Sequence, residues 1–130
     1  NWTLMRCIQC NTRFPQDDVS LESLPPLCSH CQGVVKGDIV MFGEPIPPDV
    51  LGICQSEALK SDCVMILGTS GVVYPAAALP ELARQTNGAT LIEINPEETA
   101  LTETCDIVVR APTGEAMPKI VELLRERVSQ

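Results

Sequence analysis

Two Cys-x-x-Cys pairs near the start of the chain constrain its fold more than any other feature. Cys7 and Cys10 form the first pair, and Cys28 and Cys31 form the second pair. Each pair presents two thiolates from one tight turn, and four thiolates arranged as a tetrahedron satisfy Zn²⁺ completely. Because no coordination position stays open for water, we expect a structural zinc site. Bound zinc adds an apparent binding energy on the order of 10 kcal/mol to a module too small to fold on its own core.

Two other interpretations of these four cysteines stay open at this point. They could form a redox-active dithiol or disulfide pair, or their spacing could be a coincidence. The chain has seven cysteines, and this odd number argues against a fully paired secreted disulfide framework. His30, the only histidine, could replace a ligand, but the four cysteines make it redundant and we expect an exposed turn residue. We expect Cys54, Cys63 and Cys105 to be small buried hydrophobic residues.

The pattern of the sequence divides the chain into two parts. Residues 1–36 are rich in turn-forming residues and hold both cysteine pairs, so we expect a small zinc-binding module there. In residues 37–130, short apolar runs alternate with longer helical patterns, which is typical of βα units on a parallel sheet. We therefore predict an α/β fold for this second part. The expected strands cover residues 38–42, 64–67, 90–94 and 106–109, and the expected helices cover residues 48–61, 75–86 and 114–128.

The charge and hydropathy of the chain disfavour two classes of partner. Nine Lys and Arg residues stand against seventeen Asp and Glu residues, and the net charge is −8. Without a basic cluster to release counterions from a phosphate backbone, we expect no direct nucleic-acid binding. No apolar run approaches the roughly 18 residues that cross a bilayer, so we expect no membrane partner. We predict a cytoplasmic protein in a reducing intracellular compartment, and no motif indicates its oligomeric state.

The first residues do not resemble a natural start. The chain begins with Asn1, and the first methionine, Met5, lies inside what the pattern suggests is an ordered strand. The first residues also lack the charged and apolar regions of a secretory signal. We therefore expect the chain to be truncated at its N-terminus.

Three loops at expected strand ends carry groups that can hold a nucleotide. An apolar strand runs into the glycine- and hydroxyl-rich turn of residues 68–71, and Pro75 follows at a position suited to the first turn of a helix. In an open parallel sheet, ligands bind beyond the carboxyl ends of the strands, where helix N-termini offer free N–H groups to anions. Each loop alone is also consistent with ordinary turn chemistry, but three at successive strand ends favour a nucleotide crevice. The other two loops are Asn95-Pro96-Glu97 and residues 110–114.

The order of these motifs along the chain resembles that of the sirtuins, a family of NAD-dependent protein-lysine deacylases. The resemblance runs over essentially all 130 residues, and the combination is far more specific than any single motif. It implies a partial Rossmann-like parallel sheet, the C-terminal half of the sirtuin large domain, in residues 37–130, next to the small four-cysteine zinc module. The motifs are the two cysteine pairs, Val40-Met41-Phe42-Gly43-Glu44, Pro47, Gly68-Thr69-Ser70, Tyr74-Pro75-Ala76-Ala77 and Ile94-Asn95-Pro96.

The resemblance also implies roles for individual residues. NAD⁺ would be the co-substrate, and the segment from Val40 to Glu44 resembles the strand to which an acyl-lysine protein or peptide adds through main-chain hydrogen bonds. Gly43 suits such a close approach of two backbones. The implied NAD-binding residues are Gly68, Thr69 and Ser70 around the ribose and phosphate groups, Asn95, Pro96 and Glu97 at the adenosine ribose, and Thr113 near the adenine; the implied peptide-binding residues are Val40, Phe42, Gly43 and Glu44.

The family reaction needs a group that the resemblance places outside the chain. In that reaction the acyl oxygen attacks the nicotinamide ribose, and a histidine acts as general base so that the acyl group ends on ADP-ribose. Residues 2–7 resemble the segment just after the family's catalytic His-Gly pair, so we expect the base just upstream of Asn1. The family's glycine-rich first turn is also missing. Because a general base contributes roughly 10²–10⁴-fold in rate and half of the pocket is expected to be missing as well, we expect the 130 residues alone to be inactive and to bind NAD poorly.

Three hypotheses about function follow. The chain is part of an active deacetylase or desuccinylase, the second because residues 69–75 most resemble the branch that includes desuccinylases. Alternatively, it is a non-catalytic, zinc-stabilised binding or interaction module derived from a sirtuin. A free-standing zinc ribbon joined to an unrelated α/β tail is disfavoured by the ordered downstream motifs.

Overall fold

The computed structural model describes residues 3–129 of the chain. The chain divides into two compact units, Asn1–Ile46 and Pro47–Gln130. This division lies later in the chain than the predicted boundary after residue 36. The reason is that residues 35–37 form a strand that pairs inside the first unit, so the segment following that strand belongs to this unit as well.

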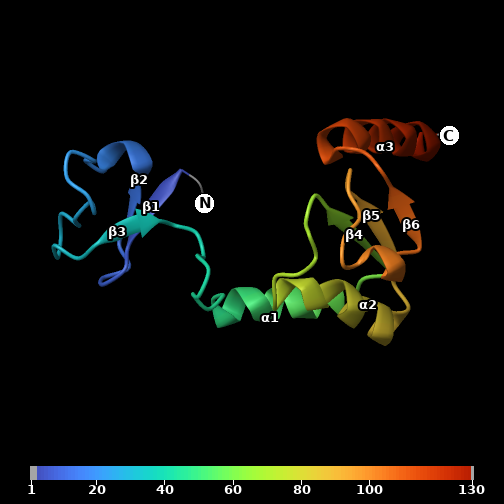
Figure 1. The fold of residues 1–130 in the computed structure, drawn as a ribbon, viewed down its shortest axis with the longest axis horizontal. Helices are drawn as coiled ribbons and strands as arrows, with labels where there is room; N and C mark the ends of the chain where they lie inside the picture. The colour runs from blue at the N-terminus through green and yellow to red at the C-terminus, as the bar shows by residue number, and fades with distance from the viewer. Residues whose placement is uncertain (1–2, 130) are drawn as a thin grey trace. The chain divides into compact units, whose positions relative to one another are not determined.

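The first unit is built on a three-stranded antiparallel sheet. Its strands are β1 (Leu4–Cys7), β2 (Arg13–Pro15) and β3 (Val35–Gly37), in the order β2-β1-β3 (Figure 1). A 3-10 helix, Gln16–Asp18, follows β2. Two of the three residues in its buried cluster are cysteines, so little of this core is ordinary aliphatic packing. The cluster consists of Cys7, Cys28 and Val35, with Met5, Phe14, Val19 and Cys31 packed against it.

The predicted strand over residues 38–42 is not formed. Strand β3 ends at Gly37, and residues 38–44 follow as bends, turns and irregular backbone. The carboxylate of Glu44 accepts the Met41 N–H at 3.1 Å and the Lys36 ammonium at 2.9 Å. Gly43 has a φ of +85°, a conformation that residues with a Cβ rarely adopt. Local hydrogen bonds and this turn therefore take the place of strand pairing.

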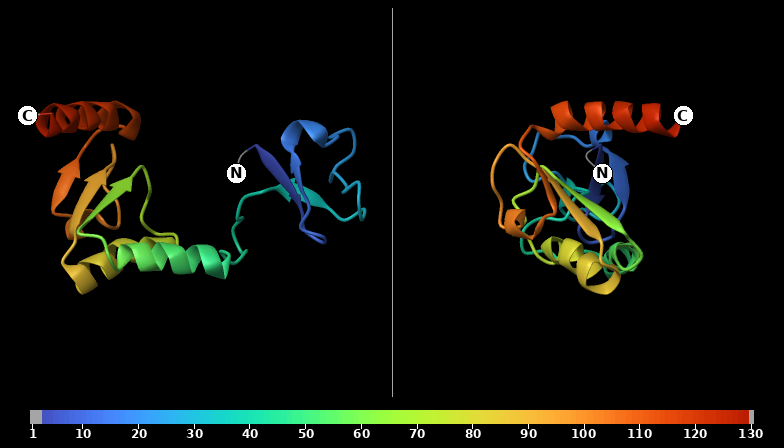
Figure 2. Two further views of the ribbon diagram at one scale, coloured as in Figure 1. Left: turned by 180° about the vertical axis from the view of Figure 1, so that it is seen from behind. Right: turned by 90° about the vertical axis from the view of Figure 1, so that its right-hand side faces the viewer.

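The second unit is an α/β fold with a parallel sheet, as predicted. Strands β4 (Cys63–Leu67), β5 (Thr90–Ile94) and β6 (Ile107–Val109) lie in the order β4-β5-β6. Their register places Leu67 beside Ile94 and Ile94 beside Val109, so all three carboxyl ends meet at one edge. Helices α1 and α2 lie together on one side of the sheet and α3 lies on the other (Figures 1 and 2). The helices are α1 (Pro48–Ala58), α2 (Leu79–Asn87) and α3 (Thr113–Val128), with 3-10 helices at Ala76–Ala78 and Thr102–Thr104.

The core of the second unit lies around the central strand. Leu91 and Ile94 of β5 are fully buried. Three alanines, Ala58, Ala83 and Ala89, form a buried cluster, and their small side chains let α1 and α2 pack closely. Strands β4 and β6 are the edges of this sheet in the described part of the chain. Apolar side chains stay exposed on the edge strands and on α3, namely Met65, Leu67, Ile107, Val108, Val121, Leu123, Leu124 and Val128.

The three cysteines outside the two pairs are not all buried. The prediction is wrong for Cys54 and Cys63, which are exposed, because Cys54 lies on an exposed part of α1 and Cys63 begins an edge strand. Cys105 is half-buried, and this burial, with the nearby charge of Glu93, raises the pKa of its thiol. Within residues 3–129, no helix has both the length and the apolar character to span a bilayer.

Candidate metal centre and nucleotide-binding site

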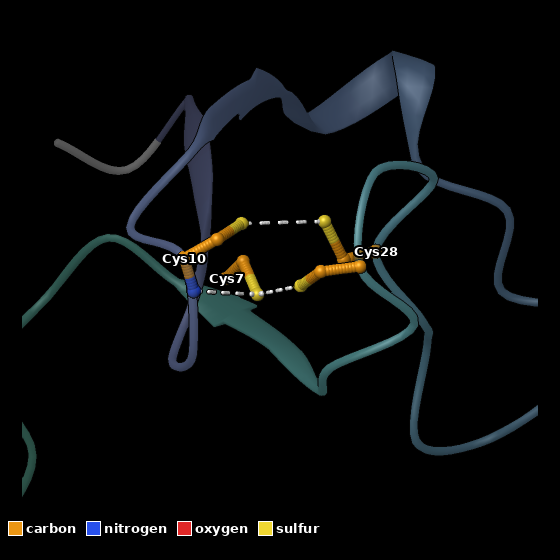
Figure 3. Close-up of side chains that lie close together, drawn as sticks. Cys7, Cys10 and Cys28 are labelled. Atoms are coloured by element: carbon orange, nitrogen blue, oxygen red, sulfur yellow. Dashed lines mark hydrogen bonds between the residues drawn. The ribbon is translucent and has the colours of Figure 1, made fainter.

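The four predicted zinc ligands converge in the first unit. Cys7 ends β1, Cys10 follows in the next turn, and Cys28 lies at the start of a second turn (Figure 3). Cys31 lies at the end of that second turn. Their sulfur atoms all lie within 4.8 Å of one another, with 3.5 Å between those of Cys7 and Cys31 and 3.7 Å between those of Cys10 and Cys28. Four sulfurs at about 2.3 Å from a tetrahedral zinc ion lie about 3.8 Å apart. The cluster therefore fits a structural zinc ion held by four thiolates.

Backbone N–H groups point at the sulfurs of this cluster. Those of Gln9 and Cys10 donate to Cys7 Sγ at 3.4 and 3.5 Å. The N–H of His30 donates to Cys28 Sγ at 3.4 Å, at the matching position of the second turn. Hydrogen bonds of this kind stabilise the thiolate over the thiol. Both turns are thus arranged to present anionic ligands to a cation.

The thiols of the cluster differ in acidity. Hydrogen bonds with the side chain and backbone of Thr12 lower the pKa of Cys10 to about 6. The Gly33 N–H acts to lower the pKa of Cys31, but the Cys10 sulfur, desolvation and the other sulfurs together raise it to about 12. Four thiolates this close repel one another, so the cluster resists full ionisation on its own. A divalent cation removes that obstacle, because a coordinating thiol is deprotonated outright.

His30 is exposed, as predicted, and is not part of the sulfur cluster. Its ring instead lies 5.8 Å from the ring of Phe14, centroid to centroid, with the planes tilted by 41°. Within the described residues, the four cysteines are the one group of three or more ligating side chains close enough to hold a metal ion.

A pocket of about 360 Å³ opens at the carboxyl ends of strands β4 and β5. The turn after β4 forms one wall, and the loop after β5 forms the other wall. Ligands of open parallel sheets bind at this edge. The lining residues are Gly68, Thr69, Ser70, Asn95, Glu97, Glu98, Thr99 and Ala100.

Asn95 connects the two walls of the pocket. Its Nδ2 donates to the carbonyl oxygen of Thr69 at 2.9 Å, and its Oδ1 accepts the N–H of Glu97 at 3.2 Å. The hydroxyl of Thr69 accepts the N–H of Gly71 at 3.4 Å, which tightens the turn after β4. Gly68 has a φ of +58°, so this turn favours glycine at that position. One amide side chain therefore links the two walls of the pocket.

Five of the seven predicted NAD-binding residues line this pocket, and Pro96 and Thr113 do not. Pro96 lies in the loop between two lining residues. Thr113, the first residue of α3, donates its hydroxyl to the carbonyl oxygen of Ile94 at 3.4 Å. A Cβ added to Gly68 would lie 3.4 Å from the Thr113 hydroxyl oxygen, so Thr113 lies at the same sheet edge.

The sequence did not predict that Glu98, Thr99 and Ala100 line the pocket. They follow the predicted motif directly, in the connection of residues 95–106 between two neighbouring strands. The length of this connection could have indicated that it lines a site, because long loops without a strand or α-helix of their own are often functional.

The lining groups suit a ligand rich in hydroxyls. The side chains of Thr69, Ser70 and Asn95 donate and accept hydrogen bonds, and the carboxylates of Glu97 and Glu98 can accept them from ribose hydroxyls. The lining residues include no Lys or Arg, so a phosphate group here would depend on backbone N–H groups. Binding and orientation are the chemistry that these groups support.

The predicted peptide-binding segment lies in the first unit and is mostly exposed. Val40 has an exposed fraction of 46%, Phe42 one of 94%, and Gly43 has open space around it. Glu44 is different, because it is half-buried and its carboxylate pairs with Lys36. In this structure Glu44 therefore shapes the segment, while Val40 and Phe42 stay free to meet a partner.

Comparisons with known proteins agree with these features. A model of the Sir2 family matches residues 1–75. The NAD-dependent protein deacylase 2 of Pyrobaculum aerophilum is 39% identical over 123 residues, which cover 95% of this chain and 49% of the relative. A mutant Sir2 homologue in complex with ADP-ribose has a TM-score of 0.90 and 37% identity, and the match covers 99% of this chain and 51% of that chain. A Sir2 complex with a p53 peptide and NAD⁺ has a TM-score of 0.84 and 29% identity, covering 94% of this chain and 52% of that chain.

The chain spans about half the length of the relatives that it matches. The family model covers more than half of the 130 residues. The matched region contains both cysteine pairs and the turn after β4, and the fold agrees closely with those of the solved relatives. The chain therefore belongs to the Sir2 family.

Proposed function

We propose that the chain forms the zinc-bearing and nucleotide-binding part of an NAD-dependent protein-lysine deacylase, which transfers an acyl group from lysine to ADP-ribose. The observation that carries this proposal is the pocket at the carboxyl ends of β4 and β5. The related structures hold ADP-ribose or NAD⁺, which contain the ribose hydroxyls that the pocket suits. In our proposal the residues that contact the dinucleotide are Gly68, Thr69, Ser70, Asn95 and Glu97, with Pro96 and Thr113 beside them.

We propose that an acyl-lysine peptide binds along residues 40–43. The exposed side chains of Val40 and Phe42 and the open space around Gly43 support this role, and one relative is solved with a p53 peptide. The peptide would add its backbone to a segment that forms no strand without it. Residues 69–75 favour the branch that includes desuccinylases, so a succinyl group is a candidate acyl group alongside acetyl.

We propose that the 130 residues alone do not deacylate a peptide. Their one histidine, His30, lies in a turn of the cysteine cluster, where its backbone N–H donates to Cys28 Sγ. Nicotinamide release from NAD⁺ in the presence of an acetylated or succinylated peptide would contradict this proposal. The alternative function, a non-catalytic zinc-stabilised interaction module, also predicts no deacylation. It differs from the main proposal because it predicts no nucleotide binding.

Calorimetric titration of the zinc-loaded chain with ADP-ribose tests the proposed function. We expect weak but saturable binding, and we expect Asn95→Ala to weaken it at least about tenfold, because the substitution removes a polar lining group and its hydrogen bonds to both walls. Asn87→Ala is the matched control. The Asn87 amide also bridges chain segments, donating to the carbonyl oxygens of Lys60 and Ser61 at 3.4 and 3.1 Å, but it lies outside the pocket.

The outcomes separate the two functions. Absence of ADP-ribose binding by the folded, zinc-loaded chain would sink the nucleotide-binding proposal and favour the interaction module. Equal affinities for the wild type and Asn95→Ala would show that ADP-ribose binds elsewhere.

A further inference from the structure

A carboxylate lies fully buried in the middle of the second unit, outside the pocket wall. Glu93 is in the central strand β5 between two isoleucines, and its exposed fraction is 0%. A buried charge is costly unless an opposite charge and hydrogen bonds compensate it. Glu93 is not a lining residue of the nucleotide pocket, so direct ligand contact does not explain it.

Three side chains compensate this carboxylate. Arg110, which follows β6, donates from Nη1 to Glu93 Oε2 at 2.8 Å. The hydroxyl of Thr102 donates to the same oxygen at 2.7 Å, and the hydroxyl of Thr99 donates to Oε1. Both threonines belong to the connection between β5 and β6. The buried carboxylate therefore anchors the loop that forms one wall of the pocket.

Arg110 extends the same network to the main chain of the pocket wall. Its Nη1 also donates to the carbonyl oxygens of Glu97 at 2.9 Å and Asn95 at 3.4 Å, and its Nη2 donates to Thr102 Oγ1 at 3.1 Å. Asn95 and Glu97 line the pocket, whereas Arg110 does not. One guanidinium thus fixes the backbone of two lining residues from behind.

The loop is also held from the turn after β4. The N–H of Leu101 donates to Thr99 Oγ1 at 3.1 Å, which links Leu101 to the network around Glu93. The Leu101 side chain packs against Gly71, where an added Cβ would lie 2.7 Å from Leu101 Cγ. Residues 95–102 are therefore fixed between the buried ion pair and the opposite wall of the pocket.

We propose that Glu93 and Arg110 are positioning residues that hold the loop of residues 95–102 in the form that binds a ribose of the dinucleotide. The identity of this ligand rests on the proposed function, whereas the effect on the loop does not. The pair acts through the backbone of Asn95 and Glu97 and through the hydroxyls of Thr99 and Thr102, and it makes no contact with the ligand.

The sharpest test changes Thr102, whose hydroxyl joins Glu93 to Arg110. Thr102→Val keeps the shape of the side chain and removes this hydroxyl, while Thr102→Ser keeps it. We expect Thr102→Val to weaken the binding of ADP-ribose to the zinc-loaded 130-residue chain by about tenfold and Thr102→Ser to stay within about twofold of the wild type. Calorimetry measures both affinities, and thermal unfolding shows that both variants are folded.

A second pair of variants separates positioning from general stability. Arg110→Met removes the cation of the network. Arg84→Met is the control. Arg84 also pairs with an acid, Asp106, and donates to the Thr104 carbonyl oxygen. Neither of these two hydrogen bonds involves residues 95–102. We expect Arg110→Met to weaken ADP-ribose binding more than about tenfold and Arg84→Met to leave it within about twofold.

Amide hydrogen exchange without nucleotide distinguishes this inference from the proposed function. The amides of Thr99 and Leu101, which donate inside the loop, should exchange faster in Arg110→Met than in Arg84→Met. If the wild type binds no ADP-ribose and this exchange still rises, the proposed function fails and the positioning of the loop is supported. Unchanged exchange, or wild-type affinity in folded Thr102→Val, would overturn the positioning role.

Discussion

The two units of the chain hold their folds by different means. In the first unit, two of the three residues in the buried cluster are cysteines of the metal site, Cys7 and Cys28. In the second unit, the core is aliphatic around Leu91 and Ile94, and one buried acid, Glu93, is fully compensated. We therefore expect the fold of the first unit to depend on a bound ion and that of the second to depend on packing and internal hydrogen bonds. We therefore expect one unit to unfold while the other stays folded.

Zinc removal gives the largest expected effect and tests this difference directly. Chelation, or Cys28→Ser, should unfold the first unit, because it removes an apparent binding energy on the order of 10 kcal/mol. We expect the amide NMR signals of residues 3–46 to collapse while those of residues 47–129 stay dispersed. Cys54→Ser, which changes an exposed cysteine outside the cluster, is the control. Dispersed signals from a zinc-free first unit would break the comparison.

Leu91→Ala should produce the converse result. Its side chain is fully buried on the central strand, so we expect a loss of about 2–5 kcal/mol in the free energy of unfolding of the second unit. The zinc content of the protein should not change. Leu123→Ala, at a position that is 62% exposed, should cost less than about 0.5 kcal/mol. Loss of zinc from Leu91→Ala would show that the two units are not independent.

Two glycines of the second unit allow a finer test of packing. Gly71 and Gly88 have φ values of +70° and +66°, so alanine is strained at both. At Gly88 an added Cβ meets nothing within 4 Å, and we expect Gly88→Ala to cost about 1 kcal/mol. At Gly71 it would lie 2.7 Å from Leu101 Cγ, so Gly71→Ala should cost about 1–3 kcal/mol more. Equal melting temperatures for the two variants would contradict the close packing at Gly71.

Acidification has the smallest expected effect on the stability of the second unit. It should also unfold the two units at different pH values. Burial acts to raise the pKa of Glu93, but hydrogen bonds from Thr99, Thr102 and Arg110 outweigh it, so its pKa lies below the ordinary value. A lowered folded-state pKa stabilises the fold above the unfolded-state pKa of about 4.3, and this stabilisation is lost as the pH falls through the folded value.

We therefore expect the first unit to unfold at a higher pH than the second, since its zinc ligands compete with protons. Circular dichroism and NMR during acidification measure both transitions. Glu93→Gln should flatten the pH dependence of the second transition. An unchanged acid transition in this variant would mean that another carboxyl group controls it.

The features that the sequence predicted are those that depend on local pattern. The spacing of Cys7, Cys10, Cys28 and Cys31 predicts the metal cluster because each pair is formed by one turn. The three strands of the parallel sheet follow from short apolar runs. The expected strand at residues 38–42 has a similar apolar pattern, but Glu44 and the turn at residue 43 satisfy this segment locally.

The residues that the sequence did not predict depend on contacts between distant segments. Glu93 interrupts an apolar strand, which is an available signal of a buried polar network. Its partner Arg110 lies beyond the next strand, and only the pairing of β5 with β6 brings the two together. The exposure of Cys63 likewise depends on β4 being an edge strand, which no local pattern reveals.

The strand order of the second unit has a kinetic consequence. Strands β4, β5 and β6 pair in the order in which the chain supplies them, so every new strand of this sheet is added on the side away from β4. Within residues 3–129, no strand of this sheet pairs with the outer edge of β4. Such an edge is a template on which a strand of another molecule can add. We therefore expect the folding of the 130-residue chain to compete with self-association, so that its yield on refolding falls as the protein concentration rises.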